Sequence, residues 1–400
     1  MTHPAHPHPQ QPGGIGSAGG PGPIGSGAPV PPTGPPATAG PLSPAPTNPA
    51  PHAGSAQPPA SQASAARTAT PIDVPANTAE IGHAQKILSD VEKYLDHFVV
   101  GQARLRETLV LGLLTGGHLL LESVPGLAKT TAASALANAV HAEFARIQCT
   151  PDLLPSDIIG SQIYNSRTGG FDIQLGPVHA NLVLLDEINR SSAKTQSAML
   201  EAMQEKQTTI GGHRYDLPAP FLVMATQNPI EQEGTYQLPE AQLDRFMIKD
   251  VLDYPTPEEE MEILRRLDKG VFDADERPGP ACDLDDVRTL QQTARNIYVD
   301  PAISRYLVEI VTATRNAGRY IGPLARFIEC GASPRASIAF TNASRALAMI
   351  RGRNYVIPED VKDLAVRVLR HRIILGFEAV AENVPVEHII GELLKAVRTP

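Results

Sequence analysis

Short apolar runs alternate with longer amphipathic segments through the middle of this 400-residue chain. The runs are rich in Leu, Val and Met and end in turn residues or acidic pairs, a pattern typical of buried parallel strands. Apolar residues recur at helical spacing between them. This order predicts an α/β fold with a buried parallel sheet. The predicted strands cover residues 119–121, 145–149, 182–185, 221–226 and 247–251.

From Pro255 onward the pattern is that of helices alone. Five segments carry an apolar stripe, and several begin with a capping residue followed by proline, which favours a helix start. The segments are 258–267, 284–296, 301–315, 334–351 and 358–370. We therefore predict an α/β core over residues 75–255 and an all-helical domain over residues 256–400.

The first 74 residues differ from the rest in composition. They consist almost entirely of Pro, Gly, Ala, Ser, Thr, Gln and His, and Arg67 is the only ordinary charge before Asp73. Such segments bury too little apolar surface to offset the entropy of ordering. The prediction for residues 1–74 is a disordered tail with polyproline II character in its Pro-rich pieces.

Charge and cysteine usage narrow the class of protein. The net charge of −9 disfavours nonspecific nucleic-acid binding through bulk charge. The three cysteines show no metal-ligand or disulfide spacing, which suits a reducing compartment. No apolar stretch approaches the roughly 20 residues that span a bilayer, and the N-terminus lacks the features of a signal peptide. We expect a soluble, cytoplasmic protein with no membrane span.

The stretch after the first predicted strand has the features of a phosphate-binding loop. A tight Pro-Gly turn leads into a small-residue helix, so free backbone N–H groups and the helix dipole favour an anion. Ser123 and Ala128 stand where the strict motif has glycines, so the motif alone is an incomplete match. The candidate nucleotide-binding residues are Ser123, Val124, Pro125, Gly126, Leu127, Ala128, Lys129, Thr130 and Thr131.

An acidic pair, Asp186 and Glu187, follows the strand at 182–185. Ligands of open α/β sheets bind at the carboxyl ends of strands, where these side chains emerge. Together with a phosphate loop, Asp186 and the Thr130 hydroxyl would hold Mg²⁺, and Glu187 would activate the attacking water. Taken alone, an acidic pair at a strand end is more often a helix cap.

Four further positions each have a functional and a structural interpretation. Asn228 can orient a water molecule or serve as a turn residue. Arg245 either pairs with a local acid or reaches toward the nucleotide of a neighbouring subunit. Arg335 lies in the first turn of a helix, where its charge opposes the helix dipole unless an anion offsets it. Gly101-Gln102 is a turn between helices that could also lie against an adenine.

Two segments are predicted to be β-hairpins. Residues 161–178 alternate around Thr168-Gly169-Gly170, and residues 207–217 turn at Gly211-Gly212. Projecting loops of this kind often contact partners.

Taken together, these stretches resemble the MoxR family of AAA+ ATPases over about residues 78–397. The resemblance rests on residues 122–130, 150–157, 185–190, 194–198 and 238–246. It implies a three-layer α/β core with a helical lid, binding of ATP and Mg²⁺, and assembly into a ring, usually a hexamer.

The resemblance also implies residue roles. Asn228 looks like the first sensor, Arg245 like an arginine finger that acts on the neighbouring subunit, and Arg335 like the second sensor on the lid. Gly101 and Gln102 look like the adenine-side box. The implied catalytic set is Lys129, Glu187, Asn228, Arg245 and Arg335, and the implied metal-binding pair is Thr130 and Asp186.

By resemblance, the activity is Mg²⁺-dependent ATP hydrolysis that drives chaperone-like remodelling or maturation of protein clients, with a von Willebrand factor A domain partner. A DNA-associated motor is the alternative, since related ring ATPases with similar hairpins translocate on DNA. Arg167 and Arg214 supply basic side chains near the hairpin turns. The negative net charge and the lack of a separate DNA-binding motif argue against that alternative.

Overall fold

The computed structural model describes residues 76–229, 236–272 and 278–400. The chain divides into two units, residues 1–68 and 69–400, and all described residues belong to the second. The tail predicted for residues 1–74 lies outside the described residues.

A five-stranded sheet, in which every neighbouring pair of strands is parallel, forms the centre of the α/β region. The strand order is β2-β5-β8-β1-β9, so β8 lies between β5 and β1. All five predicted strands are confirmed. Their bounds are β1 Leu119–Glu122, β2 Phe144–Gln148, β5 Leu182–Asp186, β8 Leu222–Gln227 and β9 Ile248–Val251.

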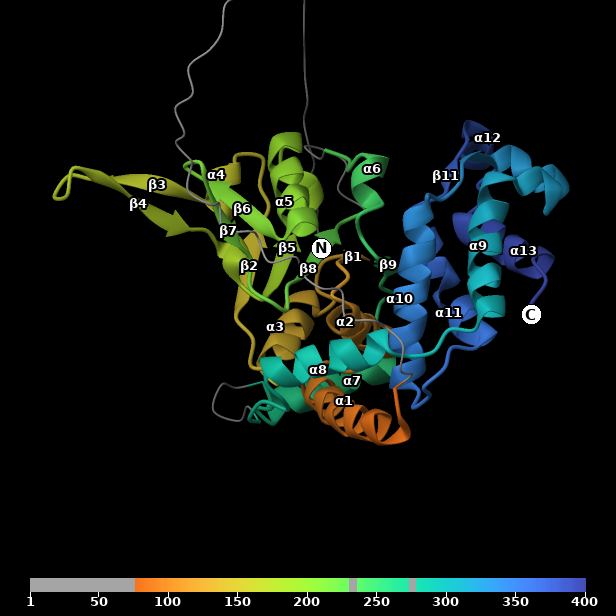
Figure 1. Ribbon diagram of the computed structural model, residues 1–400, viewed down its shortest axis with the longest axis horizontal. Coiled ribbons are helices and arrows are strands. Elements are labelled where there is room, and N and C mark those ends of the chain that lie inside the picture. Colours follow the sequence, from red (N-terminus) through yellow and green to blue (C-terminus); the bar gives the residue numbers. More distant parts are fainter. Residues whose placement is uncertain (1–75, 230–235, 273–277) are drawn as a thin grey trace, which may run out of the picture. The chain divides into compact units, whose positions relative to one another are not determined.

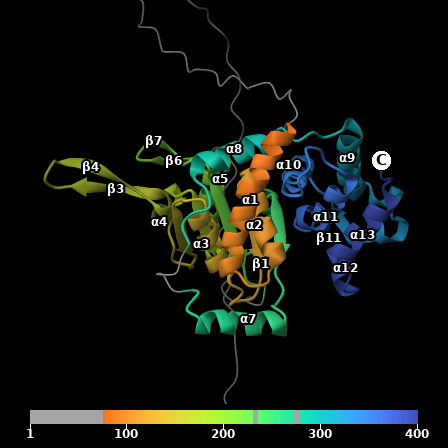
Figure 2. The same cartoon turned by 90° about the horizontal axis from the view of Figure 1, so that it is seen from below.

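Alternate side chains along these strands enter two different cores, because successive residues of a strand point to opposite faces. Leu119 and Leu121 pack in one core with the helices α1, α2 and α3, whereas Leu120 packs in the other with α4 and α5. Figures 1 and 2 show the helices on the two faces of the sheet. The predicted three-layer architecture is confirmed. The bounds are α1 Thr78–Phe98, α2 Ala103–Thr115, α3 Lys129–Ala139, α4 Pro155–Ile159 and α5 Ala193–Glu205.

Both predicted hairpins are present. The first consists of β3 (Gly160–Asn165) and β4 (Gly170–Leu175), and the second of β6 (Gln207–Ile210) and β7 (His213–Asp216). The β3–β4 hairpin projects away from the sheet (Figure 1). Its exposed apolar side chains are Ile163, Tyr164, Phe171 and Leu175.

The region after residue 256 is mainly helical, as predicted. One difference is a two-stranded antiparallel ribbon formed by β10 (Ile328–Cys330) and β11 (Ile374–Leu375). The sequence did not predict this ribbon, because strands this short show no alternation of apolar and polar residues. The helices are α7 Pro257–Asp268, α8 Leu284–Arg295, α9 Pro301–Arg315, α10 Pro334–Ile350, α11 Pro358–Leu369, α12 Phe377–Ala381 and α13 Val386–Ala396. The remaining short helices in the described residues are α6 Glu240–Leu243, η1 Pro177–His179, η2 Ile188–Arg190, η4 Ala317–Arg319 and η5 Gly322–Phe327.

A buried polar network joins the C-terminal helices to the sheet. Arg367 of α11 donates to a Glu107 carboxylate oxygen at 2.6 Å and to the Thr108 hydroxyl at 3.1 Å. The Thr108 hydroxyl in turn donates to Asp250 of β9 at 2.7 Å. Since α8 also packs against α1 and α2, the domain boundary at residue 255 stays a prediction. Within the three described stretches, no helix is long and apolar enough to cross a membrane.

Candidate nucleotide-binding site

The loop after β1 has the backbone shape of a phosphate cradle. The Ser123 amide donates to the carbonyl oxygen of Gln227 on β8 at 3.1 Å, which fixes the start of the loop. Gly126 and Ala128 have φ angles of 87° and 52°, in the left-handed region that favours glycine. A side chain in that region costs about 1–2 kcal/mol, which Ala128 bears at the N-terminus of α3. The first amides of α3 have no helical acceptors and can donate to an anion bound at the loop.

Ser123, which departs from the usual glycine, contacts the loop lysine. The Lys129 ammonium donates to the Ser123 hydroxyl at 2.7 Å and to the Val124 carbonyl oxygen at 3.3 Å. Burial lowers the pKa of Lys129, and the carboxylates of Asp186 and Glu187 partly offset that effect. The lysine is thus held in the loop by weak neutral acceptors that a phosphate can replace.

A single hydroxyl from β8 orients the acidic pair. Thr226 Oγ1 donates to Asp186 Oδ1 at 2.8 Å and accepts from the Glu187 amide, also at 2.8 Å. Glu187 has a φ angle of 58°, an uncommon conformation for a residue with a side chain. The Thr226 contacts hold this strained turn at the end of β5.

Two polar side chains of β2 also contact the acidic pair, and the sequence pattern did not identify them. Arg146 donates to Asp186 Oδ2 through Nη2 at 2.6 Å and Nε at 3.2 Å. The amide of Gln148 donates to Glu187 Oε2 at 3.0 Å, and its carbonyl oxygen accepts from Arg146 Nη2 at 3.0 Å. Their signal in the sequence is a pair of polar residues two positions apart at the carboxyl end of a strand.

Residues 125–131 of the predicted phosphate loop meet the metal and water-activating residues Asp186 and Glu187 in one cavity of about 410 Å³, and Ser123 and Val124 are not among its lining residues. Thr130 and Asp186 supply hydroxyl and carboxylate oxygens, the ligand atoms that Mg²⁺ prefers. Among the described residues, no group of three or more His, Cys, Asp and Glu side chains could hold a metal by itself. The pair therefore fits Mg²⁺ that is bound together with a phosphate, as is usual for this ion.

A second cavity of about 560 Å³ adjoins the first and shares four of its loop residues. Its wall is largely apolar and includes Phe98, Val100, Ile263, Leu267 and Phe272. An apolar cavity next to a phosphate loop suits a nucleotide base. Sequence reasoning did not assign these residues to the site, because they come from α1, α7 and the residues just after these helices, which are distant in the chain.

Gly101 and Gln102 follow Val100 in the chain but do not themselves line this second cavity. A Cβ atom at Gly101 would lie 2.3 Å from the Glu259 carboxylate of α7, so the glycine allows α7 to approach the turn. The side-chain amide of Gln102 donates through Nε2 to the carbonyl oxygen of Asp253 at 2.8 Å. Their contact with an adenine stays a prediction.

Asn228 follows β8 directly and is 6% exposed. Because β8 lies between β1 and β5, this residue emerges between the phosphate loop and the acidic pair. That location suits the predicted sensor role.

Arg245 and Arg335 lie elsewhere, at the amino ends of β1 and β9. They line one cavity of about 270 Å³ with Gly117, His118 and Met247, which precede those strands. Arg245 donates through Nη1 to the carbonyl oxygen of Leu200 at 2.9 Å. The structure therefore does not bring these two arginines to the phosphate loop of their own chain.

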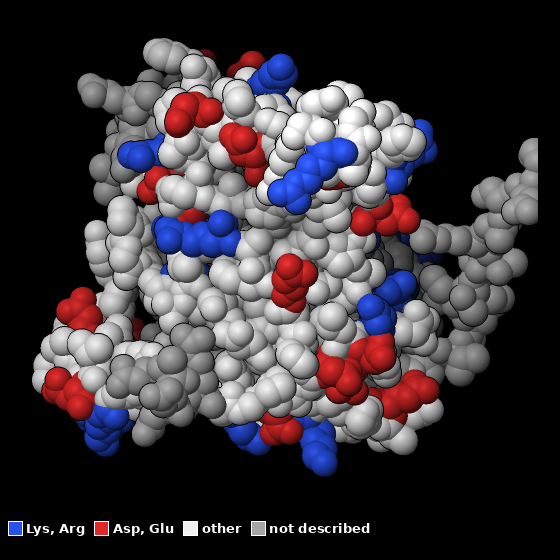
Figure 3. Space-filling view, turned by 90° about the vertical axis from the view of Figure 1, so that its left-hand side faces the viewer, with Lys and Arg blue, Asp and Glu red and all other residues white. Residues whose placement is uncertain are grey.

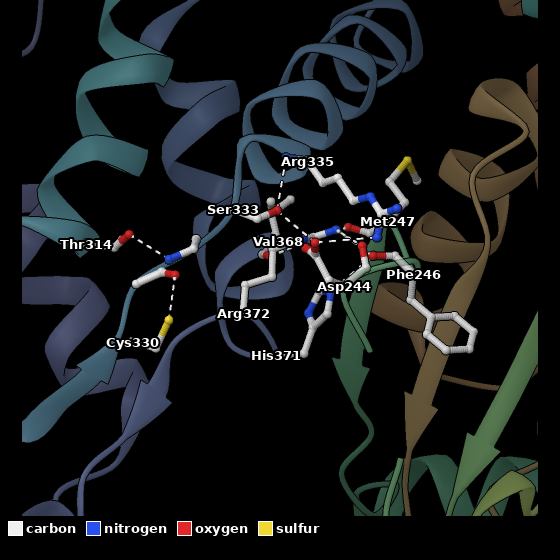
Figure 4. Close-up of polar contacts among 12 residues, drawn as sticks. Asp244, Phe246, Met247, Thr314, Cys330, Ser333, Arg335, Val368, His371 and Arg372 are labelled. Atoms are coloured by element: carbon white, nitrogen blue, oxygen red, sulfur yellow. Dashed lines mark hydrogen bonds and ion pairs between the residues drawn. The ribbon is translucent and has the colours of Figure 1, made fainter. Parts of the chain in front are cut away.

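Asp244 is the centre of a polar cluster beside Arg245 (Figure 4). Its carboxylate accepts from Arg372 Nε at 2.8 Å and from the Ser333 hydroxyl at 2.7 Å, and it lies 3.7 Å from Arg335 Nη1. Arg372 also donates to the carbonyl oxygen of Phe246 at 2.6 Å. Among the described residues, Asp244 thus pairs with arginines of the C-terminal region and not with Arg245.

The fold and the site define a class of protein, a nucleotide-binding α/β domain followed by helices. Residues 118–248 match the family described as ATPases associated with various cellular activities (AAA), and residues 325–393 match the AAA lid domain. Chaperone MoxR1 of Mycobacterium tuberculosis is 45% identical over 353 residues, which are 88% of this chain and 92% of that protein. The chain belongs to the MoxR family of AAA ATPases.

Other relatives agree with this assignment. Protein MoxR of Paracoccus denitrificans is 32% identical over 303 residues, which are 72% of this chain and 88% of that protein. A crystal structure from Cytophaga hutchinsonii has a TM-score of 0.76 and 44% sequence identity, covering 80% of this chain and 97% of that one. Nucleotide binding and ATP hydrolysis are the general activity of this family, with a chaperone-like role.

Proposed function

We propose that this protein is a Mg²⁺-dependent ATPase of the cytoplasm that assembles as a ring, in the form of a hexamer, and remodels protein clients. The observation that carries the proposal is the meeting of Lys129, Thr130, Asp186 and Glu187 in one cavity beside a second, apolar cavity. The first cavity suits the triphosphate and the second suits the base.

Four residues of the first cavity have a chemical task in this proposal. Lys129 would exchange its contact with Ser123 for a phosphate oxygen, and Thr130 and Asp186 would hold Mg²⁺. The bound ion would neutralise the charge that develops on the transferring phosphoryl group. Glu187 accepts a proton from the attacking water, which Asn228 helps to orient.

The location of Arg245 and Arg335 supports a ring. The four residues of β1 span about 13 Å between the amino end of the strand and the phosphate loop. An arginine at the amino end is therefore poorly placed for its own nucleotide but is free to face that of a neighbour. We propose that Arg245 acts there as an arginine finger and that Arg335 contacts the same nucleotide as the second sensor.

The surface supports a protein client rather than DNA. Exposed apolar side chains lie on the β3–β4 hairpin, where the Tyr164 and Phe171 rings meet edge to face with centroids 5.6 Å apart. Among the described residues on this side, acidic and basic side chains are scattered among uncharged ones and form no basic stripe (Figure 3). From the family resemblance, we propose a partner that contains a von Willebrand factor A domain.

Replacing Glu187 with Gln tests the proposed function. The substitution removes the group that accepts the proton but keeps its size, so ATP turnover should fall on the order of 10²-fold or more. ATP binding should be retained. Glu201→Gln, which alters an exposed residue of α5, is the matched control and should hydrolyse ATP normally. Normal turnover in the Glu187→Gln protein would disprove the assignment.

A further inference from the structure

The guanidinium of Arg146 occupies one oxygen of the Asp186 carboxylate, which the proposed metal site needs. Thr226 takes Oδ1, and Arg146 takes Oδ2 with two N–H groups. Both carboxylate oxygens are therefore engaged by groups of the protein itself. Arg146 and Asp186 also line the same cavity as Lys129 and Thr130.

Arg146 and a divalent cation cannot both sit against Asp186 Oδ2 at low energy. Two positive charges a few ångström apart repel each other strongly, and the repulsion grows where water is partly excluded. The Asp186 side chain is only 12% exposed, so solvent screens little of this competition. One of the two cations has to yield.

The two contacts of Asp186 differ in how easily they can break. The Arg146 side chain is 49% exposed, so water can replace its contacts and it can rotate away at small cost. Thr226 is fully buried and also holds the Glu187 amide, so its contact stays in place and keeps the carboxylate oriented. Phosphate oxygens in the same cavity would offer the released guanidinium new acceptors.

We propose that Arg146 is an exchangeable counter-cation of Asp186, which it holds until nucleotide and Mg²⁺ arrive together. When nucleotide binds without Mg²⁺ the guanidinium stays on the carboxylate, and Mg²⁺ that arrives with the triphosphate has to displace it. Arg146 is therefore a residue that regulates metal entry, and its removal strengthens the coupling between Mg²⁺ and nucleotide. This inference rests on the proposed ATPase function.

The experiment measures the affinity of the full-length protein for a fluorescent, slowly hydrolysed ATP analogue in excess Mg²⁺ and in EDTA. The ratio of the two Kd values reports how much Mg²⁺ strengthens binding, independently of hydrolysis. Arg146→Gln should raise this ratio about tenfold, equivalent to about 1.4 kcal/mol. Arg146→Lys keeps the charge but loses the two-pronged contact, so it should give a smaller rise and serves if the Gln variant fails to fold.

Two controls make the result specific. Arg167→Gln alters an exposed arginine in the turn of the β3–β4 hairpin and should leave the ratio unchanged. In an Asp186→Asn background, Arg146→Gln should have no further effect, because the charge that it guards is gone.

The outcomes separate this inference from the proposed function. An unchanged or lower ratio in Arg146→Gln, or a full effect that persists in the Asp186→Asn background, overturns the exchange while leaving the ATPase intact. If the unaltered protein fails to bind the analogue under either condition, the proposed function and this inference both fall.

Discussion

Two arginine–aspartate pairs at opposite ends of the same sheet have similar contact distances and different surroundings. Arg146 and Asp186 lie at the phosphate loop with closest atoms 2.6 Å apart, and the arginine side chain is 49% exposed. Arg372 and Asp244 lie beside Arg245 at 2.8 Å, and that arginine side chain is 2% exposed. Burial, not contact distance, distinguishes an exchangeable pair from a fixed one.

The fixed pair orders the backbone around Arg245. Arg372 donates to the carbonyl oxygens of Phe246 at 2.6 Å and Met247 at 3.2 Å as well as to Asp244. Residues on both sides of Arg245 are thereby hydrogen-bonded to the segment that follows α11. In the proposed ring, one end of the sheet changes partners as nucleotide binds, while the other presents a rigid arginine to the neighbour.

Replacing Arg372 with Met should have the largest effect on stability. Removing one partner of a buried pair leaves Asp244 without its main contact, so the free energy of unfolding should fall by about 3 kcal/mol. The matched change Arg146→Met breaks a half-exposed pair and should cost less than about 1 kcal/mol. Urea denaturation of the two variants measures the difference. Equal losses would show that burial does not separate the two pairs.

Lowering the pH should reduce the stability of the folded protein through His118, which lies at the same end of the sheet as Arg245. His118 is buried, accepts from the Val223 amide and lies 3.2 Å from the Met203 carbonyl oxygen, and burial lowers its pKa from 6.5 to about 4. Between these values the unfolded chain binds a proton that the folded chain does not. Stability is therefore lost as pH falls through 6.5 toward 4, by about 2 kcal/mol at pH 5.

A variant separates this contribution from those of other groups. His118→Gln removes the titrating ring, so its loss of stability between pH 7 and pH 5 should be smaller by about 2 kcal/mol than that of the unaltered protein. Urea denaturation at the two pH values measures both. The same loss in both proteins would assign the pH dependence elsewhere, for example to His371, whose pKa burial also lowers.

Local patterns were enough to predict the strands, both hairpins and the convergence of Lys129, Thr130, Asp186 and Glu187. Each of these depends on residues adjacent in sequence and on the rule that ligands bind at the carboxyl ends of parallel strands. Arg146 was missed because its contact with Asp186 depends on the pairing of β2 with β5. No local sequence pattern determines the order of the strands in the sheet.

The arginines show a second limit. The sequence placed Arg335 in the first turn of a helix, and the structure agrees, with Ser333 as the cap of α10. The packing of the C-terminal helices decides which end of the sheet α10 faces. No local sequence pattern predicts that packing. The pairing of Asp244 with Arg372 could not be predicted for the same reason, since the two residues are 128 positions apart in the chain.

ATP turnover by mixed subunits tests the central claim, that one subunit's phosphate loop is completed by the next subunit's arginine. Arg245→Ala keeps its own phosphate loop and acidic pair, whereas Glu187→Gln keeps Arg245. Each variant alone should lose turnover on the order of 10²-fold or more. Mixed before assembly, they should form interfaces that pair an intact loop with an intact arginine, and turnover should exceed the sum of the separate activities at least tenfold. A mixture no more active than that sum would contradict the account.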